Sequence, residues 1–223
     1  MRRMRVNVFV LVAAAAAALA GAVIAASIVS GREPAAEESS GVRPGATELA
    51  GIPQQGIALG DPEAPRTLAV YGDVQCPYCA VWDEGSLPGI VDDHVRGGSL
   101  RIVFRGLAFI GPESDLGLRA VLAAGLQDKA WNLLNVLSAN QGAENAGWLT
   151  EESLRRFGET IPGLDVDRLL SDLGASEVEA EIAAARAAAE AGDVRGTPSF
   201  ELGPTGGALT PVGQQDLDAA LAG

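Results

Sequence analysis

The stretch Cys76-Pro77-Tyr78-Cys79 decides how this chain is interpreted, because it holds both of the chain's cysteines. Two thiols separated by two residues can close into a small disulfide and reopen by exchange with the thiols of another molecule. Pro77 suits the first position of a helix, where its missing N–H is not needed. Cys76 would then lie at the helix N-terminus, where unpaired N–H groups and the helix dipole favour a thiolate. The spacing therefore predicts a redox-active pair.

Two other interpretations of the pair stay open. A Cys-X-X-Cys pair can be half of a zinc site, but structural zinc takes four ligands and the chain adds one histidine, His94. Such a metal would have to be shared with another chain. The pair can also form an inert structural disulfide, although so short a loop constrains the unfolded chain very little. The chemistry of the pair therefore favours a redox role.

The composition excludes some partners. The chain has 223 residues and a formal net charge of −13, from 16 Lys and Arg against 29 Asp and Glu. This length suits one substantial domain with accessory segments. Nucleic-acid binding needs a basic surface, so the acidic excess argues against a nucleic-acid partner. It argues equally against docking of the folded domain on anionic lipid.

Residues 1–30 have the pattern of a membrane anchor or signal segment. Three arginines within residues 1–5 precede 24 uncharged residues, from Val6 to Val29. As a helix this stretch is about 36 Å long, enough to cross a hydrocarbon core of about 30 Å. The length favours an uncleaved single-pass anchor with the catalytic domain on the extracytoplasmic side. A cleaved signal and a secreted product are the alternative, because ten of the 24 residues are alanine.

Residues 31–55 are expected to form a flexible linker, and residues 56–223 a single domain. The linker is rich in small and polar residues without periodicity, so it has little apolar surface to bury. A short docking strand within it is the alternative. Export of the domain matters for the cysteines, since disulfides persist outside the cytosol.

A strand, a helix and a second strand are predicted around the cysteine pair. Residues 67–71 form a short apolar run typical of a buried strand, and residues 100–105 alternate as a second strand does. The helix opened at Cys76 is expected to kink near Gly85 and Pro88. A redox pair at the first strand–helix junction is typical of a thioredoxin-like beginning.

A helical region is predicted at about residues 112–191. Leucines and alanines recur there at helical spacing, with Thr150 as an N-cap and a capping box at Ser176-Glu177-Val178-Glu179. Residues 199–202 and 208–212 then predict a hairpin, and residues 214–221 a short closing helix.

Several pieces of sequence occur together in one order. They are Gly60-Asp61-Pro62-Glu63-Ala64-Pro65, Asp73-Val74-Gln75-Cys76-Pro77-Tyr78-Cys79, Phe104-Arg105 followed by Gly111-Pro112-Glu113-Ser114, and Gly196-Thr197-Pro198-Ser199-Phe200. In this order the chain resembles the DsbA-like thiol–disulfide oxidoreductases of the bacterial cell envelope. The resemblance covers residues 57 to about 221. It implies an α/β class, with a thioredoxin-like fold interrupted by a helical insertion.

The resemblance also implies roles for individual residues. Cys76 would be the nucleophile that forms a mixed disulfide with the substrate, and Cys79 would resolve it. Pro198 would be cis and would lie against the pair, and the backbone of Thr197 would bind an extended substrate. Neither a cofactor nor a metal is implied.

Departures from the family pattern leave two questions open. Many thioredoxin-fold enzymes carry a buried acid six residues before the nucleophile to move protons, and here that residue is Val70. Asp73 is the nearest acid, and it is expected either to transfer protons or to shape the turn. Pro77 and Tyr78 are expected to shape the substrate site. Because this dipeptide also occurs in reducing glutaredoxins, the direction of the reaction stays open.

The sequence thus predicts an exported thiol–disulfide oxidoreductase that acts on cysteine-containing exported proteins. A membrane redox partner would re-oxidise or reduce the pair, and the N-terminal helix would bind the membrane. One alternative is an envelope reductase or isomerase with the same site. A second is a non-enzymatic tethered binding module that uses the helical insertion.

Overall fold

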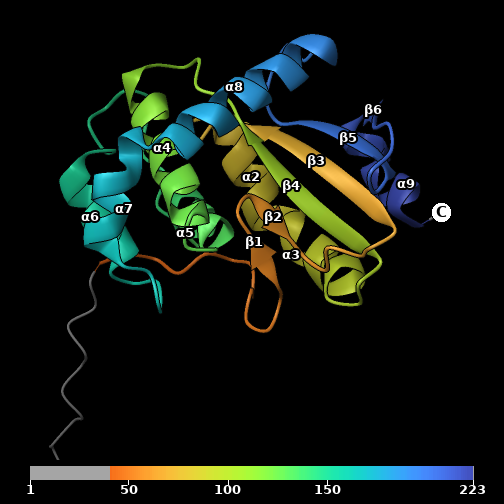
Figure 1. Ribbon diagram of the computed structural model, residues 1–223, viewed down its shortest axis with the longest axis horizontal. Coiled ribbons are helices and arrows are strands. Elements are labelled where there is room, and N and C mark those ends of the chain that lie inside the picture. The colour runs from red at the N-terminus through yellow and green to blue at the C-terminus, as the bar shows by residue number, and fades with distance from the viewer. Residues whose placement is uncertain (1–40, 223) are drawn as a thin grey trace, which may run out of the picture. The chain divides into compact units, whose positions relative to one another are not determined.

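The computed structural model describes residues 41–222 (Figure 1). The expected anchor or signal, residues 1–30, and the first part of the expected linker lie outside the described residues. Within residues 41–222, every helix is too short or too polar to cross a membrane.

Six strands form one mixed sheet in the order β1-β2-β4-β3-β5-β6. The strands are β1 (Gln54–Gln55), β2 (Ala58–Leu59), β3 (Arg66–Gly72), β4 (Leu100–Gly106), β5 (Ser199–Pro204) and β6 (Thr210–Val212). The two central strands, β3 and β4, run parallel, and every other neighbouring pair is antiparallel. The strands expected on either side of the cysteine pair and the C-terminal hairpin are confirmed.

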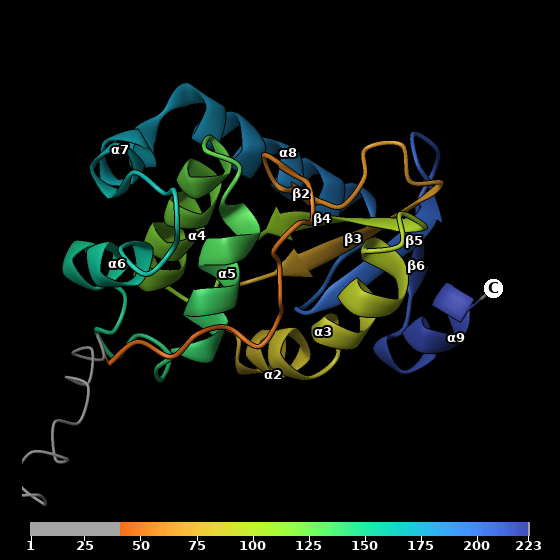
Figure 2. The same cartoon turned by 90° about the horizontal axis from the view of Figure 1, so that it is seen from below.

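Helices cover both faces of the sheet. One face carries α2 (Pro77–Gly85), α3 (Leu87–Ile90) and α9 (Leu217–Ala222), and α8 (Ser176–Ala191) crosses the other face (Figure 2). A π-helical turn, Val91–Val95, follows α3, and a 3-10 turn, Gln214–Asp216, precedes α9. The kink expected in the helix after the cysteines is confirmed, because α2 ends at Gly85 and α3 starts at Leu87.

A helical insertion separates β4 from β5. It consists of α4 (Pro112–Gly125), α5 (Ala130–Ala139), α6 (Glu151–Gly158), α7 (Val166–Ser171), a 3-10 turn (Asp172–Gly174) and α8. Figure 1 shows α4 to α7 gathered beside one end of the sheet. The structure therefore has the α/β class and the interrupted thioredoxin-like fold that the sequence predicts.

One apolar core joins the insertion to the sheet. Leu118 of α4 and Leu133 and Leu137 of α5 are fully buried in the same cluster as the strand residues. Trp131 of α5 packs edge-on against Phe104 of β4, with ring centroids 6.3 Å apart. Such continuous packing holds the insertion in a fixed position relative to the strands that carry the site.

Residues 41–55 pack on the domain and differ in this from the expected linker. Leu49 and Ile52 are buried, and Gln54–Gln55 add an edge strand. Asn135 of α5 donates to the Thr47 carbonyl at 2.8 Å and accepts from the Thr47 N–H at 3.2 Å. The composition of this segment did not reveal these few buried residues, because most of their neighbours in the sequence are small or polar. The folded region therefore begins before residue 56.

The two predicted caps have different outcomes. The Thr150 hydroxyl accepts from the Ser153 N–H at 3.1 Å at the start of α6, as predicted. The capping box predicted at Ser176 is wrong, because α8 begins one residue earlier, with Ala175 as the N-cap. Ser176 is therefore a helical residue, and its hydroxyl contacts the Glu177 carboxylate.

Candidate active site

Cys76 and Cys79 lie where β3 ends and α2 begins. Cys76 is the N-cap of α2, in an extended conformation, and Pro77 is the first helical residue, as predicted. The N–H of Cys79 donates to the Cys76 carbonyl at 3.0 Å and closes the first turn. Both cysteines are free and buried, whereas Tyr78 between them is 73% exposed. Within residues 41–222, no three His, Cys, Asp or Glu side chains gather closely enough to hold a metal ion.

Thr197 and Pro198 form the opposite wall of the site. Antiparallel pairing of β5 with β3 sets Ser199 opposite Tyr71, so the two residues before Ser199 lie just beyond the end of β3. The Thr197–Pro198 peptide bond is cis, as expected. The Cys76 thiol donates to the Thr197 carbonyl at 3.3 Å. The fold therefore brings together two segments that are far apart in the sequence.

The two cysteines have different surroundings. Burial raises the pKa of the Cys79 thiol, because a thiolate would lose its solvation there, and the neighbouring Cys76 raises it further. The backbone N–H of Asp73 and the Thr197 side chain oppose this shift only in part. Among the residues that the structure describes, the Thr197 hydroxyl has no partner within ordinary hydrogen-bond geometry, so it remains available to Cys79. Cys79 is therefore protonated at neutral pH.

Asp73 is fully occupied by donors. Its Oδ1 accepts from the Gln75 N–H at 2.9 Å and from the Ser114 hydroxyl at 2.6 Å. Its Oδ2 accepts from the N–H groups of Phe109 and Ile110 at 3.0 and 3.3 Å. The proton-transfer role considered for Asp73 finds no support in this arrangement. The geometry favours the alternative, in which Asp73 shapes the turn before the cysteines.

Two glutamines that sequence reasoning missed hold the redox turn against the insertion. The Gln141 amide, just beyond α5, donates to the carbonyls of Val74 and Cys76 at 2.9 and 3.2 Å. The buried Gln75 accepts from the Asn145 N–H at 2.7 Å and donates to the Ser114 hydroxyl at 2.9 Å. Gln75 stands beside the cysteine motif, which is a weak signal. Gln141 had none, because 65 residues separate it from Cys76.

Polar side chains also fix the strand that carries the cis proline. The Tyr71 hydroxyl of β3 donates to the Glu201 carboxylate of β5 at 2.8 Å. Arg105 of β4 donates to the same carboxylate at 3.2 Å. Burial is the main reason why the pKa of Tyr71 is raised. This cluster ties β3, β4 and β5 together near the site.

A small cavity lies behind Cys79, and an acid that the sequence analysis missed faces it. The cavity is lined by Val70, Gly72, Asp73, Val74, Cys79, Trp82, Asp83, Phe104, Leu134, Ser138, Gln141 and Pro198. Asp83 is buried, and the Ser138 hydroxyl of α5 donates to it. Desolvation by burial raises the pKa of Asp83 to about 7. Its position within α2 gave no signal in the sequence.

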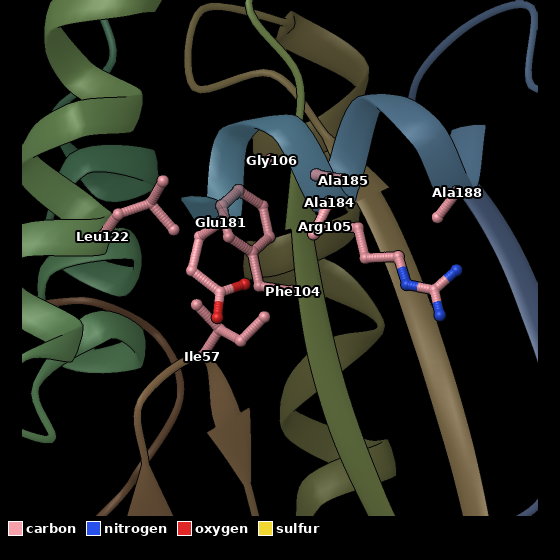
Figure 3. A pocket seen from close by; sticks show the side chains of 9 residues that line it. All are labelled: Ile57, Phe104, Arg105, Gly106, Leu122, Glu181, Ala184, Ala185 and Ala188. Atoms are coloured by element: carbon pink, nitrogen blue, oxygen red, sulfur yellow. The ribbon is translucent and has the colours of Figure 1, made fainter. Parts of the chain in front are cut away.

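A second pocket lies between α8 and β4, and it does not include the cysteines (Figure 3). Ile57, Phe104 and the alanines of α8 make it largely apolar. Figure 3 shows the Glu181 carboxylate beside Ile57, while the Arg105 guanidinium points away from that carboxylate. This apolar pocket, with an acidic and a basic side chain among its lining residues, differs from the cysteine site. Its lining residues take no part in the redox chemistry.

Known proteins are similar to this chain in sequence and in fold. A family model described as thioredoxin matches residues 53–217. A Bacillus cereus relative named "Probable disulfide bond formation protein D" is 31% identical over 145 residues, which cover 64% of this chain and 67% of the relative. A solved thioredoxin-like oxidoreductase from Silicibacter pomeroyi is 34% identical, with a TM-score of 0.60, over 74% of this chain and 89% of that one.

A further solved structure has the same fold at lower identity. BdbD from Bacillus subtilis, in its oxidised form, has a TM-score of 0.65 and 19% identity, over 81% of this chain and 96% of that one. The fold of this chain agrees with these matches. The chain belongs to the thioredoxin family and is a DsbA-like protein thiol–disulfide oxidoreductase.

Proposed function

We propose that this protein introduces disulfides into exported proteins through Cys76 and Cys79. The observation that carries the proposal is the 3.3 Å contact between the Cys76 sulfur and the Thr197 carbonyl, at the N-terminus of α2. There the attacking cysteine meets the segment that would hold an extended substrate. Tyr78, between the two cysteines, is exposed to solvent.

The reaction runs in two exchanges. A substrate thiolate attacks Cys76 of the oxidised pair, so that a mixed disulfide forms and Cys79 leaves with the electron pair of the broken bond. A second substrate thiolate then attacks the substrate sulfur of the mixed disulfide and releases Cys76. The substrate gains a disulfide, and the protein is left as a dithiol. A membrane redox partner would re-oxidise it.

The place of action follows from the expected N-terminal segment. An anchor on residues 1–30 would hold the domain on the extracytoplasmic side, close to exported substrates and to a membrane partner. The oxidising direction is supported by the name of the Bacillus cereus relative, which refers to disulfide bond formation.

Trapping tests the role of the cysteines. In a Cys79→Ser variant, Cys76 keeps its substrate as a covalent adduct, which is visible on non-reducing gels of cell envelopes. A Cys76→Ser, Cys79→Ser double variant is the matched control and gives no adduct. If the Cys79→Ser protein carries no adduct either, the proposal is wrong.

The reduction potential tests the direction. We expect a value near the roughly −120 mV of strong oxidants, whereas a reductase would lie near about −270 mV. The measurement equilibrates the protein with glutathione buffers and counts free thiols by mass spectrometry. A value at the reducing end would replace the oxidase with a reductase or isomerase at the same site.

A further inference from the structure

Cys79 and Asp83 face the same cavity from the same helix. They stand four residues apart on α2, a spacing that sets their Cβ atoms about 5–6 Å apart. Both side chains are buried, and both line the cavity. The space open to the centre of a water molecule is about 10 Å³. This is close to the volume that a single water needs, so the cavity has room for one proton-carrying water at most.

Within residues 41–222, Asp83 has no cation beside it to hold it in the charged form. Among the described residues, its carboxylate has one hydrogen-bond partner, the neutral Ser138 hydroxyl of α5. The titratable groups around it are Cys79 and Glu84 on its own helix and Asp73 on another wall of the cavity. Burial, with a smaller contribution from Glu84, gives Asp83 a pKa of about 7. A carboxyl group in this state both accepts and donates protons near neutral pH.

Cys79 needs a neighbouring group that can accept and donate a proton near neutral pH. Its raised pKa means that it must lose a proton before it attacks and must gain one after it leaves. Asp73 is occupied by four donors, and Val70 stands where an acid is often found in this fold. Val70 and Asp83 line the same cavity. Asp83 therefore places a carboxyl group in the space where the Val70 side chain, which cannot ionise, offers none.

We propose that Asp83 exchanges the proton of Cys79 and thereby replaces the acid that is missing at Val70. The inference rests on the proposed function of the cysteine pair. When the substrate thiolate bonds to Cys76, the Cys76–Cys79 bond breaks, Cys79 takes the electron pair, and the Asp83 carboxylic acid supplies the proton. In the reverse step the Asp83 carboxylate takes that proton, Cys79 attacks Cys76, and the other thiolate leaves.

The test separates the step that needs Cys79 from the step that does not. Reduced protein is mixed with glutathione disulfide, quenched with acid and analysed by mass spectrometry. Formation of the Cys76–glutathione adduct does not need Cys79, whereas decay of the adduct is the attack by Cys79. We expect the decay rate of the wild type to rise with pH, with an inflection near pH 7. Asp83→Asn should slow the decay about tenfold or more at pH 7 and remove that inflection.

Two further variants make the result specific. Glu84→Gln removes the same charge from the neighbouring, partly exposed residue and should leave the decay rate close to that of the wild type. Its inflection should move only slightly, to lower pH, because Glu84 raises the pKa of Asp83 less than burial does. Ser138→Ala removes the donor that lowers the pKa of Asp83 and should move the inflection to higher pH. This variant also decides the matter if Asp83→Asn does not fold. An unmoved inflection in Ser138→Ala, or a wild-type profile in Asp83→Asn, overturns the inference about Asp83 alone. A wild type that never releases glutathione overturns the proposed function, and the inference with it.

Discussion

Asp73 binds three separate segments through one carboxylate. Its four donors come from the redox turn, from the loop after β4 and from the first turn of α4. Bonds of this kind to a charged acceptor contribute more than neutral ones, and buried N–H groups are costly to leave unpaired. From the sequence alone this residue is named as a candidate, and its role stays open between a proton carrier and a turn former.

Asp73→Asn should destabilise the protein without removing the chemistry of Cys79. The amide NH₂ would face donors that now bind a carboxylate oxygen, so we expect a loss of about 2–4 kcal/mol in the free energy of unfolding. Urea unfolding of the reduced protein measures it. Asp61→Asn, which alters an exposed acid with one backbone donor, should cost less than about 1 kcal/mol. Equal losses in the two variants, or an altered pH profile of adduct decay in folded Asp73→Asn, would contradict this role.

At the scale of elements, the starts of α6 and α8 look alike in sequence, because each has a serine or threonine where an N-cap is expected. They differ in structure. Thr150 precedes α6 and caps it, whereas Ser176 lies inside the first turn of α8. The capping pattern names residue types three apart, but it does not fix which residue takes the extended N-cap conformation. Here Ala175 takes it, and its side chain forms no capping bond.

Thr150→Ala should therefore destabilise the protein, and Ser176→Ala should not. Loss of the Thr150 hydroxyl leaves the Ser153 N–H without its acceptor, for an expected cost of about 1 kcal/mol. The change at Ser176 should stay within about 0.5 kcal/mol, as for ordinary surface positions. Midpoints of urea unfolding give both values. A loss at Ser176 that matches the loss at Thr150 would mean that Ser176, and not Ala175, is the N-cap of α8.

At the scale of the whole molecule, features that depend on residues close together in the chain could be predicted from the sequence. Features that depend on long-range contacts could not. The strands on either side of the cysteine pair, the start of α2 at Pro77 and the C-terminal hairpin follow from residues close together in the chain. The cis form of Pro198 came from resemblance alone. Gln141, Asp83 and the packing of Leu49 depend on partners tens of residues away, and no local pattern records such partners. The sequence therefore predicts the two cysteines of the candidate site but not the residues that hold them in position.

The buried acid behind Cys79 should also make the stability of the whole domain depend on pH. Asp83 has a pKa of about 7 in the folded protein against an ordinary 3.8, so the unfolded chain releases this proton first as pH rises. The folded state is favoured most below about pH 4, and this contribution is lost as pH rises to about 7. A shift of this size sets an upper limit of about 4 kcal/mol on the effect.

Asp83→Asn removes this titration, because its amide stays neutral at every pH in the range. The variant should be as stable as the wild type near pH 4 and more stable at pH 8, by an amount below that limit. Urea unfolding of the reduced proteins at a series of pH values measures the difference. Glu84→Gln keeps the titration of Asp83 and should show the same kind of pH dependence, shifted slightly to lower pH because Glu84 raises the pKa of Asp83. A constant difference between Asp83→Asn and wild type would show that Asp83 does not titrate in this range. A difference that grows as pH rises would instead mean that the acid beside Cys79 lowers the stability of the fold at neutral pH.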